Sequence, residues 1–316
     1  MRKGFRIVRF KDWERINELR TLFCTGLGET SEQYWRWKYG SNNGQPDACL
    51  LMVENDNGRM VATFGLQPLL YRNKSEEHIV VQLQDLVVHP DFRGSGFVRV
   101  LYNAAREHSA RHGASAFVAY TNDASFGPFI KFGSIDMGDI GSLRSGTSGL
   151  SVFKTAKRRT ERYGYVFECS ETLPPDIFFS DCDTEFKMVK SAAYMRWRFD
   201  LKPDESFQWL CVRKDKALKA WFVFQENRGR IHTAVNIYDY EVAADVPLYV
   251  RREAVRCLAR RGSWVSLWGR LSDEEKCMWK NIGLTKETKA ASHFMLHFFD
   301  AATPLNWHIL RVDRDF

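Results

Sequence analysis

A glycine-rich turn between a run of β-branched residues and a helical pattern is the segment best suited to chemistry. The stretch "VVHPDFRGSGFVRVL", residues 87–101, places Arg93, Gly94 and Gly96 just before the helical pattern. A helix that opens on such a turn leaves several backbone N–H groups unpaired, with the positive end of the helix dipole behind them. Because glycine permits close approach, we expect the turn to bind a phosphate or pyrophosphate.

Two common phosphate-binding motifs do not match this turn. It has no third glycine, and no acidic residue follows about twenty positions on, as a dinucleotide-binding motif requires. It also lacks the Gly-Lys-Ser/Thr ending of a P-loop. The turn therefore predicts an anion site of another kind.

Strands alternating with amphipathic helices must position this turn. Apolar periodicity predicts strands over residues 5–10, 48–56, 59–72, 78–89 and 114–122. It predicts helices over residues 11–27, 97–113 and 124–133, the last interrupted at Gly127 and Pro128, and a short helix or turn over residues 31–39. These elements indicate a mixed α/β fold.

An internal repeat divides the chain. The string "YWRWKYGSN" from Tyr34 recurs as "YMRWRFDLK" from Tyr194, at an offset of 160, and Asp85 then corresponds to Asp239. We therefore predict two copies of one α/β unit, over residues 1–150 and 151–316. The second copy passes from strand to helix through "EVAADVPLYVRREAV", which contains no glycine turn. Only the first copy is expected to bind the anion.

The segment "VVHPDFRGSGFVRVLYNAA" resembles the acetyl-CoA signature V-x-P-x-x-R-G-x-G of the GCN5-related N-acetyltransferase (GNAT) superfamily. Asn122, Ala124 and Gly133 also lie where that family has an N-x-x-A and a K-x-G-F stretch. The resemblance is closest over residues 50–140 and extends more weakly over the chain through the repeat. It implies two tandem acyl-CoA N-acyltransferase-like domains, each a mostly antiparallel sheet with flanking helices, the second degenerate and shaping the acceptor site.

The resemblance also implies how acetyl-CoA is held. The loop amides would bind its pyrophosphate, and amides near Val87 and Val88, where two strands splay, would bind the thioester carbonyl. The residues assigned to the cofactor are Val87, Val88, Arg93, Gly94, Ser95, Gly96, Phe97, Val98 and Asn122.

Two positions depart from the family pattern. Val98 stands where the family usually has a small residue that lets the pyrophosphate approach. Phe129 stands where many members have a tyrosine that protonates the departing thiolate. That proton must then come from water, from another group such as Tyr120, or through the acceptor.

Asp85 is the candidate catalytic base, because it lies on the strand leading into the loop and an ammonium acceptor must lose a proton before attack. Asp239 matches it in the copy without the loop, so a structural role for Asp85 is equally open. Arg36 and Trp37 are candidates for acceptor binding, since arginine pairs with anions and tryptophan stacks on sugars. Their repetition in the second copy also fits structural packing.

Composition narrows the class of protein. A net charge of +7 and a pI near 9.0 favour anionic partners. The seven cysteines form no C-x-x-C pair or metal-ligand spacing, so no metal is expected. No window is apolar enough for a membrane span, and no nucleic-acid module is recognisable. We expect a cytoplasmic monomer or homodimer.

The sequence thus predicts an N-acetyltransferase that transfers acetyl from acetyl-CoA to a primary amine by direct attack. The expected acceptor is an amino sugar or an amino-acid derivative. Two alternatives stay open. A Fem-type enzyme would transfer an aminoacyl group from tRNA, but it has no need of the glycine turn. A non-catalytic protein that binds acetyl-CoA, or a protein partner, would agree with Phe129 and Val98.

Overall fold

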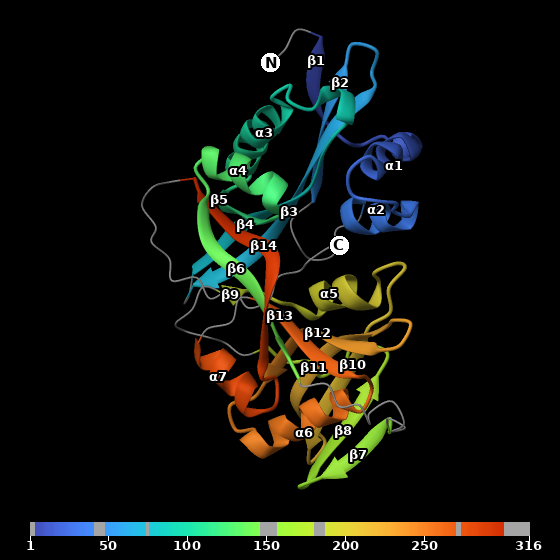
Figure 1. Ribbon diagram of the computed structural model, residues 1–316, viewed down its shortest axis with the longest axis vertical. Coiled ribbons are helices and arrows are strands. Elements are labelled where there is room, and N and C mark those ends of the chain that lie inside the picture. The colour runs from blue at the N-terminus through green and yellow to red at the C-terminus, as the bar shows by residue number, and fades with distance from the viewer. Residues whose placement is uncertain are drawn as a thin grey trace. The chain divides into compact units, whose positions relative to one another are not determined.

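The structure is a computed structural model that describes residues 4–40, 48–73, 76–145, 157–179, 187–269 and 273–299. Within these residues the chain folds into two compact units (Figure 1). The first takes residues up to 138 together with 202–204 and 291–299, and the second takes residues 139–201 and 205–290.

The first unit is built on a mostly antiparallel sheet with the strand order β1-β2-β3-β4-β5-β14. Its strands are β1 Phe5–Arg9, β2 Cys49–Asn55, β3 Met60–Asn73, β4 Glu76–Val88, β5 Ala114–Thr121 and the end of β14 Lys286–Phe298. β4 and β5 run parallel, because α3 Phe97–Arg111 connects them as a crossover, and the other strand pairs described in this order are antiparallel. The remaining helices are η1 Trp13–Arg15, α1 Ile16–Cys24, α2 Glu32–Tyr39, η2 Pro90–Phe92 and α4 Asp123–Lys131.

Side-chain alternation along β2 shows why both faces of this sheet carry helices. Cys49, Leu51 and Val53 pack with α3, whereas Leu50 and Met52 pack with α1 and with Trp35 of α2. Successive residues of a strand point to opposite faces, so a run that is apolar throughout must be covered on both sides. The result is a sheet with α1 and α2 on one face and α3 and α4 on the other (Figure 1).

In its later part the second unit follows the order of elements that the first unit has from α2 onward, whereas its beginning differs. Its strands are β7 Arg159–Arg162, β8 Tyr165–Ser170, β10 Gln208–Lys214, β11 Ala217–Arg228, β12 Thr233–Val242 and β13 Trp264–Gly269. Its helical segments are α5 Ala192–Met195, a π-helical turn Arg196–Asp200, α6 Leu248–Ala259 and α7 Asp273–Asn281. β12 and β13 run parallel across α6, as β4 and β5 do across α3. A short strand, β9 Lys187–Met188, precedes α5.

The last strand of each half joins the sheet of the other half. After α4, the strand β6 Ile135–Arg144 pairs with β13 through residues 141–144. After α7, β14 pairs with β5 through residues 293–298. This reciprocal arrangement is what a duplicated unit with exchanged final strands would show.

The mixed α/β prediction is confirmed, and the predicted elements of the first unit are present. One detail was wrong, because α4 continues through Gly127 and Pro128. Asn122 caps the first turn of α4, and Phe129, which follows the proline, is buried in the core. These contacts hold the helix although proline removes one backbone hydrogen bond.

Candidate functional site

The glycine turn between β4 and α3 has the backbone that the sequence predicts. Gly94 and Gly96 have φ values of +74° and +80°, a left-handed conformation that side chains disfavour. A Cβ atom at either position would meet nothing within 4 Å, so the space beside the turn is open. Gly96 is the N-cap residue of α3, and the first amides of the helix have no partner within the helix. The turn thus presents N–H groups to open space.

Local hydrogen bonds hold the turn in this shape. His89 accepts a hydrogen bond from the amide of Asp91 and caps the short helix Pro90–Phe92, while its Nε2 lies 2.9 Å from a guanidinium nitrogen of Arg59. Arg93 folds back, and its guanidinium donates to the carbonyl oxygens of Val88 and Thr25, both at 3.4 Å. Arg93 therefore ties the turn to β4 and to the end of α1.

The strands β4 and β5 separate next to this turn. Their parallel pairing ends at Leu83 and Ala119, although β4 continues to Val88 and β5 to Thr121. On the other side of β4, the amide of His89 donates to the carbonyl of Val61 of β3. Because N–H groups alternate along a strand, the amide of Val88 is directed toward the side where β5 has separated. An amide donor thus lies beside the glycine turn.

Asp85 lies on β4 in a buried cluster of polar side chains. Its carboxylate accepts a hydrogen bond from the Tyr39 hydroxyl and lies 3.0 Å from Lys38 Nζ. The side chains of Lys38 and Asp85 are 1% and 8% exposed. Lys38 Nζ also donates to the Tyr34 hydroxyl at 3.0 Å. A buried carboxylate of this kind needs its cationic partner, because an unpaired charge is costly inside a protein.

The backbone around Asp85 is shaped to bring these groups together. Asp85 has a φ of +53°, and the pairing of β3 with β4 shifts register next to it, which marks a β-bulge. Gly65 lies opposite, where a Cβ atom would be 2.0 Å from the Tyr39 hydroxyl oxygen. Glycine at this position therefore leaves room for Tyr39 to reach Asp85.

The sequence indicated Asp85 but not its partners Lys38 and Tyr39. The available signal was a lysine in the aromatic-rich helix sequence "YWRWKY", spaced four residues from Tyr34. Such a lysine is buried only when it has a partner.

The matching aspartate of the second unit has a similar environment. Asp239 Oδ1 accepts from Lys190 Nζ at 2.6 Å, and both side chains are less than 10% exposed. The pairing of β11 with β12 also shifts register beside it. Residues 243–247, which lead from β12 to α6, contain no glycine. A buried lysine–aspartate pair thus occurs with and without the glycine turn.

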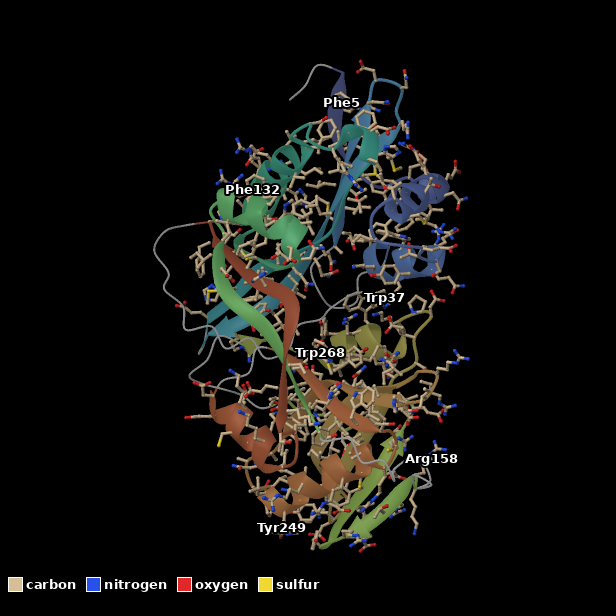
Figure 2. All side chains as sticks on the ribbon, in the orientation of Figure 1. Phe5, Trp37, Phe132, Arg158, Tyr249 and Trp268 are labelled. Carbon is tan, nitrogen blue, oxygen red and sulfur yellow. The ribbon has the colours of Figure 1, made fainter. Side chains whose placement is uncertain are left out.

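Arg36 and Trp37 lie on different sides of α2. Arg36 is exposed, pairs with Glu32 at 2.6 Å, and places its guanidinium 5.0 Å from the Trp13 ring centre. Trp37, labelled in Figure 2, is 8% exposed, and Lys202 Nζ lies 5.6 Å from its ring centre. Both side chains are thus engaged in contacts within the first unit.

Three residues near the end of β5 have definite surroundings. Asn122 accepts hydrogen bonds from Ser125 in a capping box at the start of α4. Phe129 is 3% exposed and packs edge-on against Phe64 and Tyr102. Tyr120 is half-buried against Phe294. Phe129 has no proton to donate, so this part of the site offers Tyr120 as its phenol.

The described residues contain no cluster of three or more histidine, cysteine or acidic side chains that would hold a metal. None of the described helices is long and apolar enough to cross a membrane. The groups that form the candidate site are the backbone donors of the glycine turn, the separated strands and the polar cluster around Asp85.

Comparison with known protein families gives a match to the part of the chain that contains this geometry. Residues 13–133 match the family model described as acetyltransferase (GNAT) family. The match covers somewhat more than a third of the chain. The match covers the glycine turn, the strand separation and the cluster around Asp85. No curated protein sequence matches the chain.

Solved structures similar to the chain extend beyond that match. A conserved protein from Enterococcus faecalis V583, described as a probable N-acyltransferase, has a TM-score of 0.67 at 7% identity, over 94% of this chain and 73% of that one. Saccharomyces cerevisiae N-myristoyltransferase with bound myristoyl-CoA has a TM-score of 0.59 at 10% identity, over 94% and 83%. A GCN5-related N-acetyltransferase from Anabaena variabilis ATCC 29413 has a TM-score of 0.61 at 11% identity, over 93% of this chain and 73% of that one. At such identities these likenesses show a shared fold.

Proposed function

We propose that the protein is an acyl-CoA-dependent N-acyltransferase, with acetyl-CoA as donor and a primary amine of a small molecule as acceptor. The observation that carries this proposal is the open glycine turn at the start of α3 beside the separated ends of β4 and β5. An amino sugar or an amino-acid derivative is the proposed acceptor class. A tandem origin, with a degenerate second copy, is supported by the repeated order of elements and the exchanged strands β6 and β14.

The turn would hold the pyrophosphate of the donor. The amides of Gly94, Gly96, Phe97 and Val98 are the proposed donors, backed by the dipole of the 15-residue helix α3. The amide of Ser95 donates to the Phe92 carbonyl and would help to hold the turn. Arg93 would act mainly by fixing the turn, since its guanidinium already binds two carbonyl groups. Val98 is half-buried in the first turn of the helix.

The separated strands would hold the acyl group. The amide of Val88 is the proposed donor to the thioester carbonyl, where negative charge develops during attack. Val87 is buried in the core beside α1, so its contribution would be through the backbone. Asn122 would contribute from the start of α4, where its side chain is already a cap.

Asp85 remains the proposed base and would act through Tyr39. The amine nitrogen attacks the thioester carbonyl carbon, the C–S bond breaks, and CoA leaves as a thiolate. The amine proton passes to the Tyr39 hydroxyl oxygen as the hydroxyl proton moves to Asp85, and the thiolate takes a proton from water or Tyr120. The hydrogen bond between Tyr39 and Asp85 supports this route.

A non-catalytic acetyl-CoA-binding protein is the second candidate. It is favoured by the Lys38–Asp85 pair, which occupies the base, and by Phe129 in the core. A Fem-type enzyme is less well supported, because its tRNA donor would leave the glycine turn without a role. We keep as predictions that Arg36 and Trp37 bind the acceptor and that the second unit shapes the acceptor site.

Turnover separates these candidates. CoA release is measured with a thiol reagent over a panel of amino sugars and amino acids. Replacing Tyr39 by Phe is expected to lower kcat by roughly 10²-fold or more with little change in the KM for acetyl-CoA, since general acid–base catalysis contributes this much. The matched control is Tyr34→Phe, which removes a hydroxyl that contacts Lys38 on the same helix. Acetyl-CoA binding without CoA release from any amine would favour the non-catalytic candidate.

A further inference from the structure

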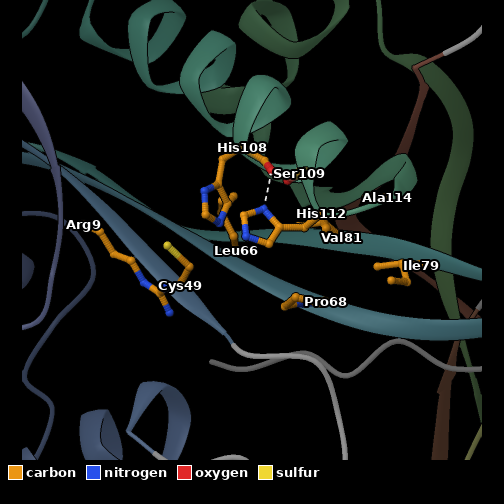
Figure 3. A pocket seen from close by; sticks show the side chains of 10 residues that line it. All are labelled: Arg9, Cys49, Leu66, Pro68, Ile79, Val81, His108, Ser109, His112 and Ala114. Atoms are coloured by element: carbon orange, nitrogen blue, oxygen red, sulfur yellow. Dashed lines mark hydrogen bonds between the residues drawn. The ribbon is translucent and has the colours of Figure 1, made fainter.

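A cavity of about 180 Å³ lies in the first unit at the end of α3 that is remote from the glycine turn (Figure 3). His108, Ser109 and His112 line it from α3, and the turn is at residue 96. At a rise of 1.5 Å per residue, the helix separates the two by about 20 Å. The cavity is therefore remote from the proposed acyl-CoA site.

The two sides of this cavity differ in character. The sheet side is mainly apolar, and its lining residues are Leu66, Pro68, Ile79, Val81 and Ala114. The helix side is polar, and Arg9 of β1 adds an exposed guanidinium (Figure 3). None of the described residues that line the cavity carries a carboxylate. An apolar wall facing cationic and hydrogen-bonding groups suits a ligand with an apolar body and one anionic end.

Ser109 provides a separate indication of a ligand. Its residue is 2% exposed, and its hydroxyl has no hydrogen-bond partner in the described part of the chain. A serine in a helix usually bonds to the carbonyl one turn earlier, and a buried hydroxyl without a partner is costly. A ligand atom in the cavity would supply the missing partner.

Two neighbouring histidines form the polar surface of the helix side. The rings of His108 and His112 are 4.3 Å apart, and His112 Nδ1 is hydrogen-bonded to the His108 carbonyl. Burial, followed by the charges of His112, Arg9 and Arg111, lowers the pKa of His108. Cys49 of β2 also lines the cavity, and burial raises the pKa of its thiol, which favours the neutral form. A bound anion would offset the positive charges of Arg9 and Arg111 and favour protonation of His108.

We propose that this cavity is a second ligand site, which takes a small carboxylate with an apolar body of about the size of benzoate or hexanoate. Its volume is similar to that of a cavity of about 150 Å³ known to accommodate benzene. The carboxylate lies toward Arg9 and the histidines, and the apolar body lies over Leu66 and Val81. This site is independent of the proposed acyl transfer.

Calorimetric titration of the full chain with benzoate, and with neutral benzamide, tests the proposal. Benzoate is expected to bind with one-to-one stoichiometry and with proton uptake, seen as a heat that depends on the ionisation enthalpy of the buffer. Benzamide, or benzoate with the Arg9→Gln variant, is expected to bind about tenfold more weakly. Arg106→Gln is the control, because Arg106 is an exposed cation of α3, the helix that carries His108 and His112, and it does not line the cavity.

A second variant separates a ligand site from a structural defect. Ser109→Ala is expected to weaken benzoate binding several-fold while leaving the free protein at least as stable, since it removes a hydroxyl without a partner. Absence of benzoate binding at millimolar concentration, equal affinity for benzamide, or wild-type affinity in Arg9→Gln would overturn the proposal. Displacement of benzoate by acetyl-CoA would also overturn it, by placing the cavity in the donor site. Failure of acetyl-CoA to bind would affect only the proposed acyl transfer.

Discussion

Replacing Lys38 by methionine should show how strongly the buried Lys38–Asp85 pair supports the first unit. The substitution keeps most of the side-chain volume but removes the ammonium group that pairs with the Asp85 carboxylate. The hydrogen bond from the Tyr39 hydroxyl to this carboxylate is kept. Both charged side chains are at least nine-tenths buried, so solvent cannot replace the lost ammonium. Removing one partner of such a pair costs about 3–5 kcal/mol.

The double variant Lys38→Met/Asp85→Asn removes both charges together. It is expected to lie within about 1–2 kcal/mol of the wild type, because replacing a complete buried ion pair is often nearly neutral. Arg36→Gln is the matched control on the same helix, since its ion pair with Glu32 has side chains 51% and 42% exposed. That exposed pair should contribute about 0–1 kcal/mol.

Urea denaturation followed by tryptophan fluorescence measures these differences. A loss of about 3–5 kcal/mol is a large part of an ordinary stability of about 5–15 kcal/mol, so the midpoint of the Lys38→Met variant should shift clearly. A shift no larger than that of Arg36→Gln would refute the reasoning. A double variant as unstable as the sum of its single changes would refute it too.

Three further predictions follow from the described contacts. Burial is the largest cause lowering the pKa of His108 and of His297. The unfolded chain then binds protons that the folded chain does not, so the melting temperature should fall as the pH drops below about 6.5, and a constant value would contradict this. Phe129→Tyr should cost about 1–3 kcal/mol in denaturation without raising turnover, because its hydroxyl would enter the aromatic core. Ser31→Ala and Ser191→Ala should each cost about 0.5–2 kcal/mol, since each serine caps its helix with the same 3.0 Å bond.

The sequence was sufficient to predict the glycine turn and the elements around it. Gly94 and Gly96 have the left-handed angles that explain their presence, and α3 follows them at once. Local patterns of this kind carry their own structural information, because backbone angles and apolar periodicity depend on neighbouring residues. The mixed α/β fold was predicted from the same local patterns, and the structure confirms it.

Contacts between distant residues were beyond that reasoning. Tyr39 and Asp85 are 46 positions apart and meet only because β4 bulges opposite Gly65. The exchange of β6 and β14 between the two halves depends on pairing across the chain, which no local pattern specifies. The capping bond of Asn122 is local, because Asn122 and Ser125 are three residues apart and form a capping box. An asparagine in this position is a recognisable signal for the start of a helix.

Calorimetric titration with acetyl-CoA tests the central claim most directly. Desulfo-CoA and ATP serve as controls, and the variant Gly94→Asp/Gly96→Asp places two carboxylates in the open space beside the turn. We expect wild-type binding in the micromolar range that the double variant loses while keeping its fold. Absence of acetyl-CoA binding by correctly folded wild-type protein, or undiminished binding by the double variant, would contradict the account.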